Sequence, residues 1–332
     1  MSFRPHSTED ERYDHPSLDL PPPLTMGEAA QSLADFATRG VQRTPTGFPT
    51  IDNKCGAPSV GELSLVWARS SAGKSTFYLN VIAQTPEIPT LVVNMEMTDR
   101  RQAAWLLGMS TPLPVSEREI EEVLRDPEHP HHEEIAEELA NLQERFPQLF
   151  FLSPNRPSVG DIEFAVQQLD DAGCRPMRVF IDHIGLMAVE SESREGYQKI
   201  TAGLHRLALE RHLSIFALQQ VKRSGGDGFA NDGHVPITLG SGVYAGEADA
   251  DFIYGLYRPD RNPLFAKSRE SFEIAGKPDE YWRLRDEYEK VRNTTRLQVI
   301  KNRPYSELEQ EGIVLKFDPY SKRLYEPVPR RR

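Results

Sequence analysis

The sequence has little cysteine and no long apolar run. Cys55 and Cys174 are the two cysteines among 332 residues. They are far apart and lack CxxC spacing, so neither a disulfide framework nor a zinc site is expected. No apolar run approaches the roughly 18 residues of a membrane-spanning helix, and the first residues lack the apolar core of a signal peptide. These features predict a cytoplasmic protein that does not act at a membrane.

Positive charge is also scarce. The chain has 39 Lys and Arg against 50 Asp and Glu, a formal net charge of −11. Such a balance argues against a broad nucleic-acid-binding surface. It remains compatible with a local basic stripe, or with a ring whose basic loops face a central channel. The length suffices for one large domain or two small ones.

The two ends of the chain differ in composition from its middle. Residues 1–24 are polar and rich in proline and are expected to form a disordered or extended arm. Residues 25–40 follow with apolar residues at helical spacing, with Thr25 as N-cap and Gly40 just past the end. This linker helix could fold back on its own core or dock on a neighbouring subunit. Residues 321–332 form a basic tail.

Between residues 41 and 320, apolar strands alternate with helices. The expected strands are 63–67, 90–94, 149–152, 179–182, 214–218, 252–257 and 297–300. This alternation predicts an α/β fold with a mostly parallel, twisted sheet and helices on both faces. A charged insertion at about 260–293 interrupts the pattern.

The most informative segment follows the first of these strands. Residues 68–76 read Ala-Arg-Ser-Ser-Ala-Gly-Lys-Ser-Thr, a Walker A phosphate-binding loop with alanine in place of its usual first glycine. A helix N-terminus binds phosphate because its N–H groups are unpaired and carry partial positive charge. Lys74 would contact the β- and γ-phosphates of ATP, and Ser75 would ligate Mg²⁺. The expected nucleotide-binding residues are Ser71, Ala72, Gly73, Lys74, Ser75 and Thr76.

Three further polar residues stand at or after the ends of apolar strands. They are Glu96, Asp182 and Gln220. Because the carboxyl ends of parallel strands meet at one edge of a sheet, these side chains are expected to surround the loop. Asp182 would hold the Mg²⁺ hydration shell and Glu96 would deprotonate the attacking water, while Gln220 would sense the γ-phosphate. Each residue alone is commonplace at a surface or a cap, but the four signals in order predict nucleoside triphosphate hydrolysis.

Candidate DNA contacts lie in two loops at the same edge. Lys222 and Arg223 open a long glycine-rich loop that could order around a nucleic-acid backbone or could be an ordinary exposed loop. Arg194 lies in a mixed-charge segment after the Asp182 strand and is the second candidate.

A last pair of cations follows the 297–300 strand. Lys301 and Arg303 could reach the γ-phosphate on a neighbouring subunit, as an arginine finger does. They could equally form the solvated rim of a hairpin.

Together these segments resemble the C-terminal motor domain of DnaB-like replicative helicases, within the RecA-like P-loop ATPases. The family's phosphate loop commonly begins with alanine, so Ala68 fits it. The resemblance covers roughly residues 43 to 317. It rests on Thr46–Asp52, Ala68–Ser75, Asn94–Met97, Ile181–Met187, Ala217–Arg223, Ala248–Asp251, Leu256–Arg258 and Lys301–Arg303.

The resemblance implies a ring-shaped hexamer with ATP at the subunit interfaces and single-stranded DNA in the channel. It implies that Lys301 and Arg303 act on the adjacent subunit's nucleotide, and that the 25–40 helix packs on a neighbour. A primase or a helicase loader would be a further partner, although only about 40 residues precede the motor, where the family has a helical domain. A compact version of this kind suits a bacteriophage replication protein.

The leading hypothesis is therefore an ATP-dependent helicase that unwinds forked DNA. One alternative is a RecA-like recombination or annealing ATPase that forms nucleotide-gated filaments on single strands. A second alternative is a nucleotide-switched regulator with no role on DNA.

Overall fold

The computed structural model describes most of the chain beyond residue 41. The described residues are 25–28, 30, 31, 34, 40, 42–111, 117–189, 191, 193–221, 232–241 and 246–327. The chain divides into two compact units, Met1–Val41 and Gln42–Arg332. The disordered or extended N-terminal segment expected at 1–24 lies outside the described residues. Residues 328–332 of the expected basic tail also lie outside them.

The first unit contains helical residues where the linker helix is expected. Residues 26–28, 30, 31 and 34 are helical. The Thr25 backbone N–H donates to Glu28 Oε2 at 2.7 Å, and the Glu28 N–H donates to Thr25 Oγ1 at 3.2 Å. This reciprocal pair is a capping box, which satisfies N–H groups at the start of a helix. The role of this helix as a linker stays a prediction.

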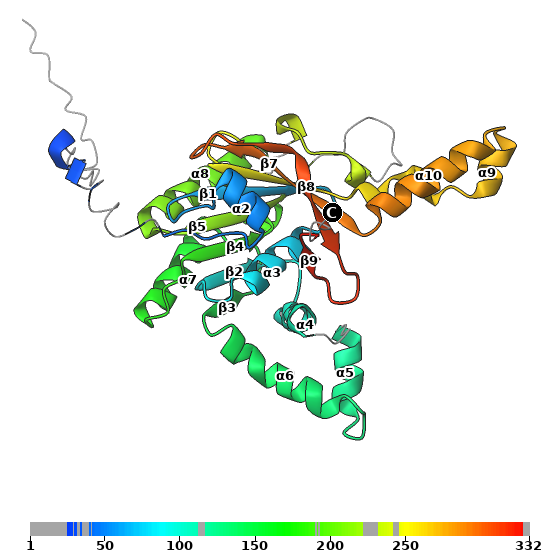
Figure 1. Cartoon of the computed structure of the whole chain (residues 1–332). Coiled ribbons are helices and arrows are strands. Elements are labelled where there is room, and N and C mark those ends of the chain that lie inside the picture. Colours follow the sequence, from blue (N-terminus) through cyan, green and yellow to red (C-terminus); the bar gives the residue numbers. More distant parts are fainter. Residues whose placement is uncertain are drawn as a thin grey trace, which may run out of the picture. The chain divides into compact units, whose positions relative to one another are not determined.

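The second unit is built on one large sheet (Figure 1). Its strand order is β3-β2-β4-β5-β1-β6-β7-β8-β9. The strands from β3 to β6 in this order pair in parallel, and β7, β8 and β9 add antiparallel to one side. The predicted α/β class with a mostly parallel sheet is confirmed. The bounds are β1 Leu63–Ala68, β2 Thr90–Asn94, β3 Leu149–Leu152, β4 Arg178–Asp182, β5 Ser214–Gln220, β6 Phe252–Tyr257, β7 Thr294–Asn302, β8 Glu309–Phe317 and β9 Leu324–Tyr325.

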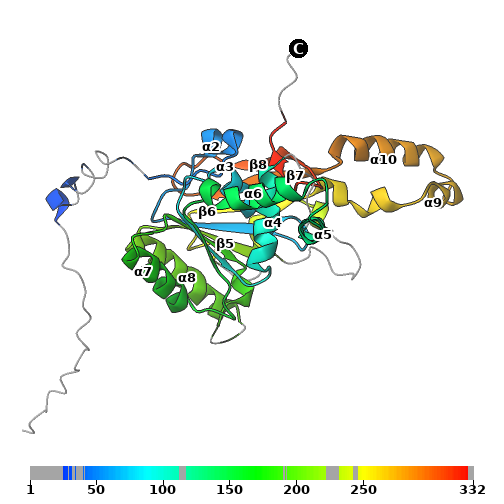
Figure 2. The same ribbon diagram turned by 90° about the horizontal axis from the view of Figure 1, so that it is seen from below.

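Helices cover both faces of the sheet (Figure 2). Successive side chains of a strand point to opposite faces, so Val66 packs in the cluster beneath α2, α3 and α4, whereas Leu65 and Trp67 pack beneath α7 and α8. The helices described in this unit are α2 Pro49–Cys55, α3 Lys74–Gln84, α4 Asp99–Ser110, α5 Glu117–Arg125, α6 His132–Arg145, α7 Val159–Asp171, α8 Arg194–Arg211, α9 Arg269–Ile274 and α10 Pro278–Val291.

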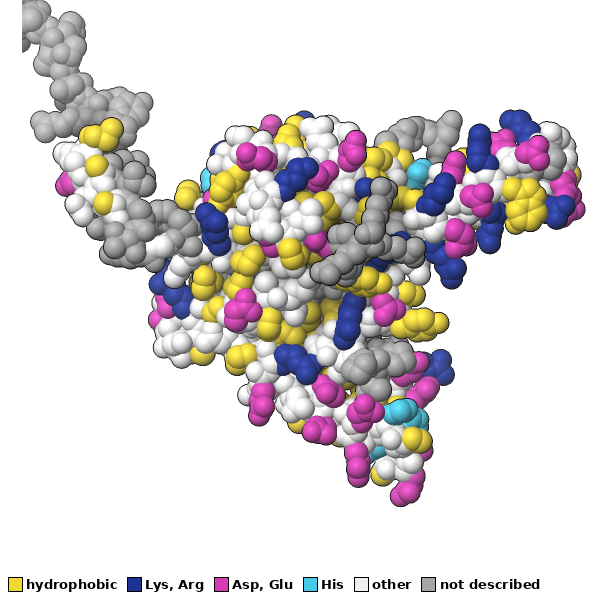
Figure 3. Space-filling model, in the orientation of Figure 1, with side chains coloured by type: hydrophobic (Ala, Val, Ile, Leu, Met, Phe, Trp, Pro, Cys, Tyr) yellow, Lys and Arg dark blue, Asp and Glu magenta, His cyan; other side chains and the backbone are white. Residues whose placement is uncertain are grey.

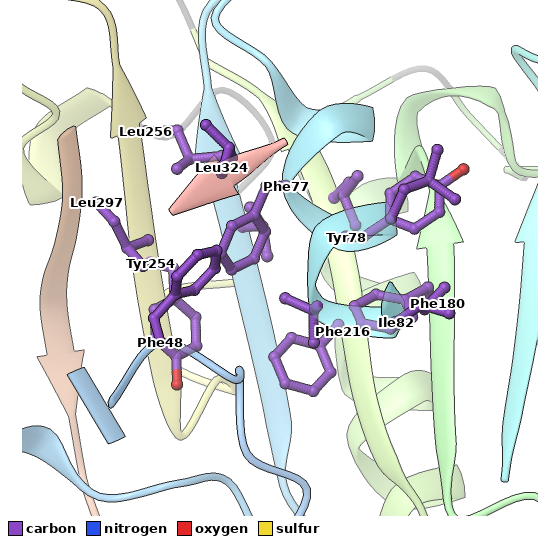
Figure 4. Close-up of a cluster of buried hydrophobic side chains, with 14 of the residues drawn as sticks. Phe48, Phe77, Tyr78, Ile82, Phe180, Phe216, Tyr254, Leu256, Leu297 and Leu324 are labelled. Carbon is purple, nitrogen blue, oxygen red and sulfur yellow. The ribbon is translucent and has the colours of Figure 1, made fainter. Parts of the chain in front are cut away.

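The core on the α3 face is rich in aromatic rings (Figure 4). Phe180 and Phe216 have ring centroids 5.0 Å apart, and Phe77 of α3 stacks on Phe48 at 5.9 Å. Burying an aromatic side chain of this kind stabilises the fold by a few kcal/mol, about 3–5 kcal/mol by truncation to alanine. Helix α3, which follows the phosphate loop, is therefore held rigidly against the sheet.

Two helical pairs extend away from the sheet (Figures 1 and 2). The acidic segment after α4 forms α5 and α6, which share a small apolar core with α4. The charged insertion after β6 forms a second projection, α9 and α10, which we call the arm. Side chains of both charge signs line the arm in Figure 3. Among the helices described, none combines the length and apolar character needed to cross a membrane.

Candidate active site

The phosphate loop has the turn that its sequence predicts. It leaves β1 at Ala68 and opens α3 at Lys74. Gly73 has φ of 99°, a left-handed conformation that favours glycine because a side chain would be strained there. The Ala72 N–H donates to the Arg69 carbonyl at 3.1 Å, and the Phe77 N–H donates to the Gly73 carbonyl at 2.8 Å. The amides that follow Gly73 therefore open the helix, where phosphate binds best.

Ser75 and Asp182 meet beside this loop. The Ser75 hydroxyl donates to Asp182 Oδ2 at 2.7 Å. Asp182 is fully buried at the end of β4, and its Oδ1 has no hydrogen-bond partner within the described part of the chain. Burial raises the pKa of Asp182, and the hydrogen bond from Ser75 opposes that rise. A buried carboxylate oxygen without a partner, next to a hydroxyl, fits Mg²⁺, which prefers oxygen ligands.

Glu96 lies near the same edge because β2 pairs with β4. Asn94 is in register with Asp182, and Glu96 follows two residues later. Its Oε1 lies 3.3 Å from His183 Nε2. The hydrogen bond from His183 lowers the pKa of Glu96, and the charges of His183 and Lys74 act in the same direction, while burial opposes them. The Glu96 side chain is 40% exposed, so an ionised carboxylate is open to water.

His183 and Asn94 are site residues that the sequence interpretation missed. His183 Nδ1 accepts from the Gly185 N–H at 3.0 Å, so the ring hydrogen of the neutral form is on Nε2, facing Glu96. Asn94 Oδ1 accepts from the N–H groups of Glu96 and Met97, each at 3.1 Å. The role of Asn94 could have been predicted from the sequence, since an asparagine before a turn often accepts a hydrogen bond from the backbone two residues further on. The contact of His183 with Glu96 depends on the pairing of β4 with β2, so no local sequence pattern predicts it.

Gln220 also reaches the phosphate loop. Its Nε2 donates to Ser70 Oγ, and the following N–H, of Val221, donates to the Ala68 carbonyl at 3.1 Å. Gln219 makes a different contact, since its Oε1 accepts from Trp67 Nε1–H at 2.7 Å. The end of β5 is thus tied directly to the loop, which suits a residue that senses its occupancy.

Lys301 and Arg303 lie away from the phosphate loop of their own chain. Lys301 is in register with Ile253 of β6, which is in register with Leu65 of β1. Ser70 is five residues further along, or about 16 Å at ~3.3 Å per residue. These two cations therefore lie toward the opposite edge of the sheet from the loop.

The predicted DNA-contacting residues are only partly described. Arg194 is the exposed first residue of α8, and the preceding Ser193 caps that helix by accepting from the Gly196 N–H at 3.1 Å. Arg194 follows β4 and so leaves the sheet at the edge that carries Asp182. Lys222 and Arg223 lie outside the described residues.

Comparison with known sequences relates this arrangement to one family. Residues 43–311 match the DnaB-like helicase C terminal domain. Two curated relatives, each 27% identical, are the replicative DNA helicases DnaB of Helicobacter pylori strains ATCC 700392 / 26695 and J99 / ATCC 700824. The matches cover 70% and 64% of this chain but 48% and 43% of the relatives. The chain therefore spans about half the length of the curated relatives it matches.

Solved structures show the same fold. The ATPase domain of G40P superposes with a TM-score of 0.69 at 17% identity, covering 92% of this chain and 99% of that one. A DnaB-like replicative helicase, studied for its interactions with primase, gives a TM-score of 0.67 at 17% identity, covering 92% of this chain and 68% of the other. The expected RecA-like P-loop ATPase core is confirmed.

Proposed function

Because this chain belongs to the family of DnaB-like helicase C-terminal domains, we propose that it is an ATP-driven DNA helicase motor that translocates on single-stranded DNA as a ring. One observation carries the proposal. The hydrolytic groups Ser75, Asp182 and Glu96 gather around the phosphate loop at one edge of the sheet, while Lys301 and Arg303 lie toward the other. Such a division suits catalysis between neighbouring subunits.

Each group at the loop has a part in hydrolysis. The amides of residues 71–75 and the Lys74 ammonium receive the phosphates of ATP. Ser75 and Asp182 would hold Mg²⁺, which neutralises phosphate charge when bound. Glu96, kept ionised by His183, orients the attacking water and accepts its proton. Gln220 passes the state of the loop through Ser70 to the segment beyond β5.

Assembly into a ring completes the site. Lys301 and Arg303 would neutralise charge on the neighbour's transferring phosphoryl group, an effect worth several orders of magnitude in rate. We propose a hexamer whose 25–40 helix docks on an adjacent subunit. A primase is a candidate partner, since one structural neighbour was studied for that interaction; a helicase loader is another.

DNA would thread past the edge where β4 and β5 end. Arg194, Lys222 and Arg223 are the proposed backbone contacts, because cations and backbone amides bind phosphate without regard to sequence. Local basic loops of this kind make DNA binding compatible with the acidic net charge of the chain.

The test is a paired assay of ATP hydrolysis and strand displacement on forks of either polarity. We expect ATPase activity stimulated by single-stranded DNA, together with unwinding of one fork polarity. Lys74→Ala and Glu96→Gln should each reduce turnover by about 100-fold or more, with the exposed Glu133→Gln as control. Brisk ATPase without displacement on any fork would contradict the proposal. Helical filaments instead of closed rings in electron micrographs would favour the recombination alternative.

A further inference from the structure

Arg303 is held by Asp251 in the isolated subunit. Asp251 lies just before β6, and its Oδ1 accepts from Arg303 Nη1 at 3.1 Å. The backbones are also joined, since the Arg303 N–H donates to the Asp251 carbonyl at 2.8 Å. A further bond runs from Arg303 Nη2 to the Ala248 carbonyl. Residues 248–251 thus form hydrogen bonds with both the backbone and the guanidinium of Arg303.

Asp251 is itself fixed. Its Oδ2 accepts from the Leu63 N–H at 3.0 Å and lies 3.4 Å from His205 Nε2. The Asp251 N–H donates to the Leu63 carbonyl at 2.8 Å. Only 10% of the Asp251 side chain is exposed. One carboxylate oxygen is thus bound to β1 and α8, and the other is directed at Arg303.

The grip leaves much of Arg303 uncovered. Its side chain is 49% exposed. A guanidinium has five N–H donors in a rigid plane, and the bonds to Asp251 and Ala248 use one donor each. The nearby Lys301 ammonium likewise donates to the Glu247 carbonyl. Glu247 thus holds Lys301. Ala248 and Asp251 hold Arg303, whose side chain remains half exposed.

We propose that Asp251 is a positioning residue for ATP hydrolysis on the adjacent subunit, because it orients the Arg303 guanidinium before that subunit's nucleotide arrives. This inference rests on the proposed function, in which Arg303 acts across the interface. A free arginine loses rotamer entropy when it is fixed on a phosphate. Asp251 has already fixed it, so the contact forms without that cost and in the geometry that hydrolysis requires.

Asp251→Asn is the direct variant. It keeps the size of the side chain and an acceptor for the Leu63 N–H, but it removes the charge that holds Arg303. In the full-length protein with single-stranded DNA, we expect kcat to fall by about 10- to 100-fold with little change in KM for ATP. Asp171→Asn is the matched control, since this exposed carboxylate at the end of α7 accepts from Gln167 Nε2 instead and should leave kcat unchanged.

A double-mutant cycle identifies the group through which Asp251 acts. In the Arg303→Gln background, Asp251→Asn should cause no further loss of kcat. Multiplicative losses, or a fall in melting temperature that parallels the fall in kcat, would show that Asp251 only supports the fold and would overturn the proposal. A normal kcat in Arg303→Gln itself would instead overturn the role of Arg303 across the interface. The two failures can be told apart, because a protein in which Arg303 has no role would still hydrolyse ATP in the presence of single-stranded DNA.

Discussion

At the scale of single residues, the contact between His183 and Glu96 orients the carboxylate that we propose to be catalytic. The two side chains are 3.3 Å apart, and Gly185 fixes the ring. We predict that His183→Ala lowers kcat by about 10-fold, the usual loss when a supporting hydrogen bond is removed, while ATP affinity measured with a fluorescent analogue stays the same. His183→Gln, which keeps a donor, should recover part of the rate. A parallel loss of affinity would count against this role.

Glu62 gives the structure a pH dependence of its own. Burial raises its pKa from 4.5 to about 7, and the nearby Asp251 charge adds to this, although the Ser59 N–H donates to the carboxylate at 2.7 Å. The folded state thus binds this proton more tightly than the unfolded state does. The resulting stability is complete below about pH 4.5 and is lost as the pH rises through about 7.

We therefore predict that Glu62→Gln stabilises the protein at pH 8 and has little effect at pH 4.5. The gain should be about 1–2 kcal/mol, after allowance for solvent screening of a partly exposed group. Urea unfolding at the two pH values measures it, with Glu133→Gln as an exposed control. The same difference at both pH values would disprove the assignment.

At the scale of elements, the short strand β9 depends on one asparagine of α3. Asn80 Nδ2 donates to the carbonyls of Thr76 at 2.8 Å and Lys322 at 2.9 Å, and the Leu324 N–H donates to its Oδ1 at 2.7 Å. Asn80 is 2% exposed, so removing its amide leaves buried groups unpaired.

We predict that Asn80→Ala lowers the free energy of unfolding by about 2–3 kcal/mol. Gln84→Ala is the matched control, since this exposed amide lies one turn further along α3 and, within the described part of the chain, donates only to the Asn80 carbonyl at 3.3 Å. Denaturant titration compares the two variants. Equal losses would mean that β9 is not anchored through Asn80.

The bounds of helices and strands are easier to predict from the sequence than the contacts between those elements. Nearly continuous apolar runs predicted β2, β3 and β6 with their observed bounds, because a strand in the middle of a covered sheet has both faces buried. Helix α8 begins at Arg194, in the mixed-charge segment expected to be a loop, because the Ser193 hydroxyl caps it. The arm was read only as a charged insertion, since polar helices bury little and leave a weak pattern.

The site divides in the same way. The phosphate loop is local in sequence, so its conformation and the Ser75–Asp182 pair could be predicted from a motif and a sheet edge. The contacts of His183 with Glu96 and of Asp251 with Arg303 join strands far apart in the chain. They depend on which strands become neighbours in the sheet, and no local pattern specifies that order.

At the scale of the whole molecule, the arm formed by α9 and α10 is a peripheral insertion whose packing is largely its own. Its ring contacts, Phe272 with Tyr281 at 6.0 Å and Phe265 with Tyr288 at 5.4 Å, are internal to the insertion. Helix α10 returns beside the short turn Pro259–Arg261, so a short linker can bridge the ends. The α5–α6 projection differs, because Leu107 of α4 is buried in its apolar cluster.

We therefore predict that replacing residues 263–291 with a short Gly-Ser linker changes the free energy of unfolding by less than about 1 kcal/mol, because a modest change in loop length costs little entropy. Nucleotide binding should persist, since the described contacts of the loop, Ser75, Asp182 and Glu96 are made with residues outside the arm. The comparison variant lacks residues 118–142 and should be destabilised by several kcal/mol, because apolar surface of α4 becomes exposed. Thermal unfolding and nucleotide titration of both deletions decide the point. An arm deletion that aggregates, or that no longer binds nucleotide, would show that the arm is part of the core.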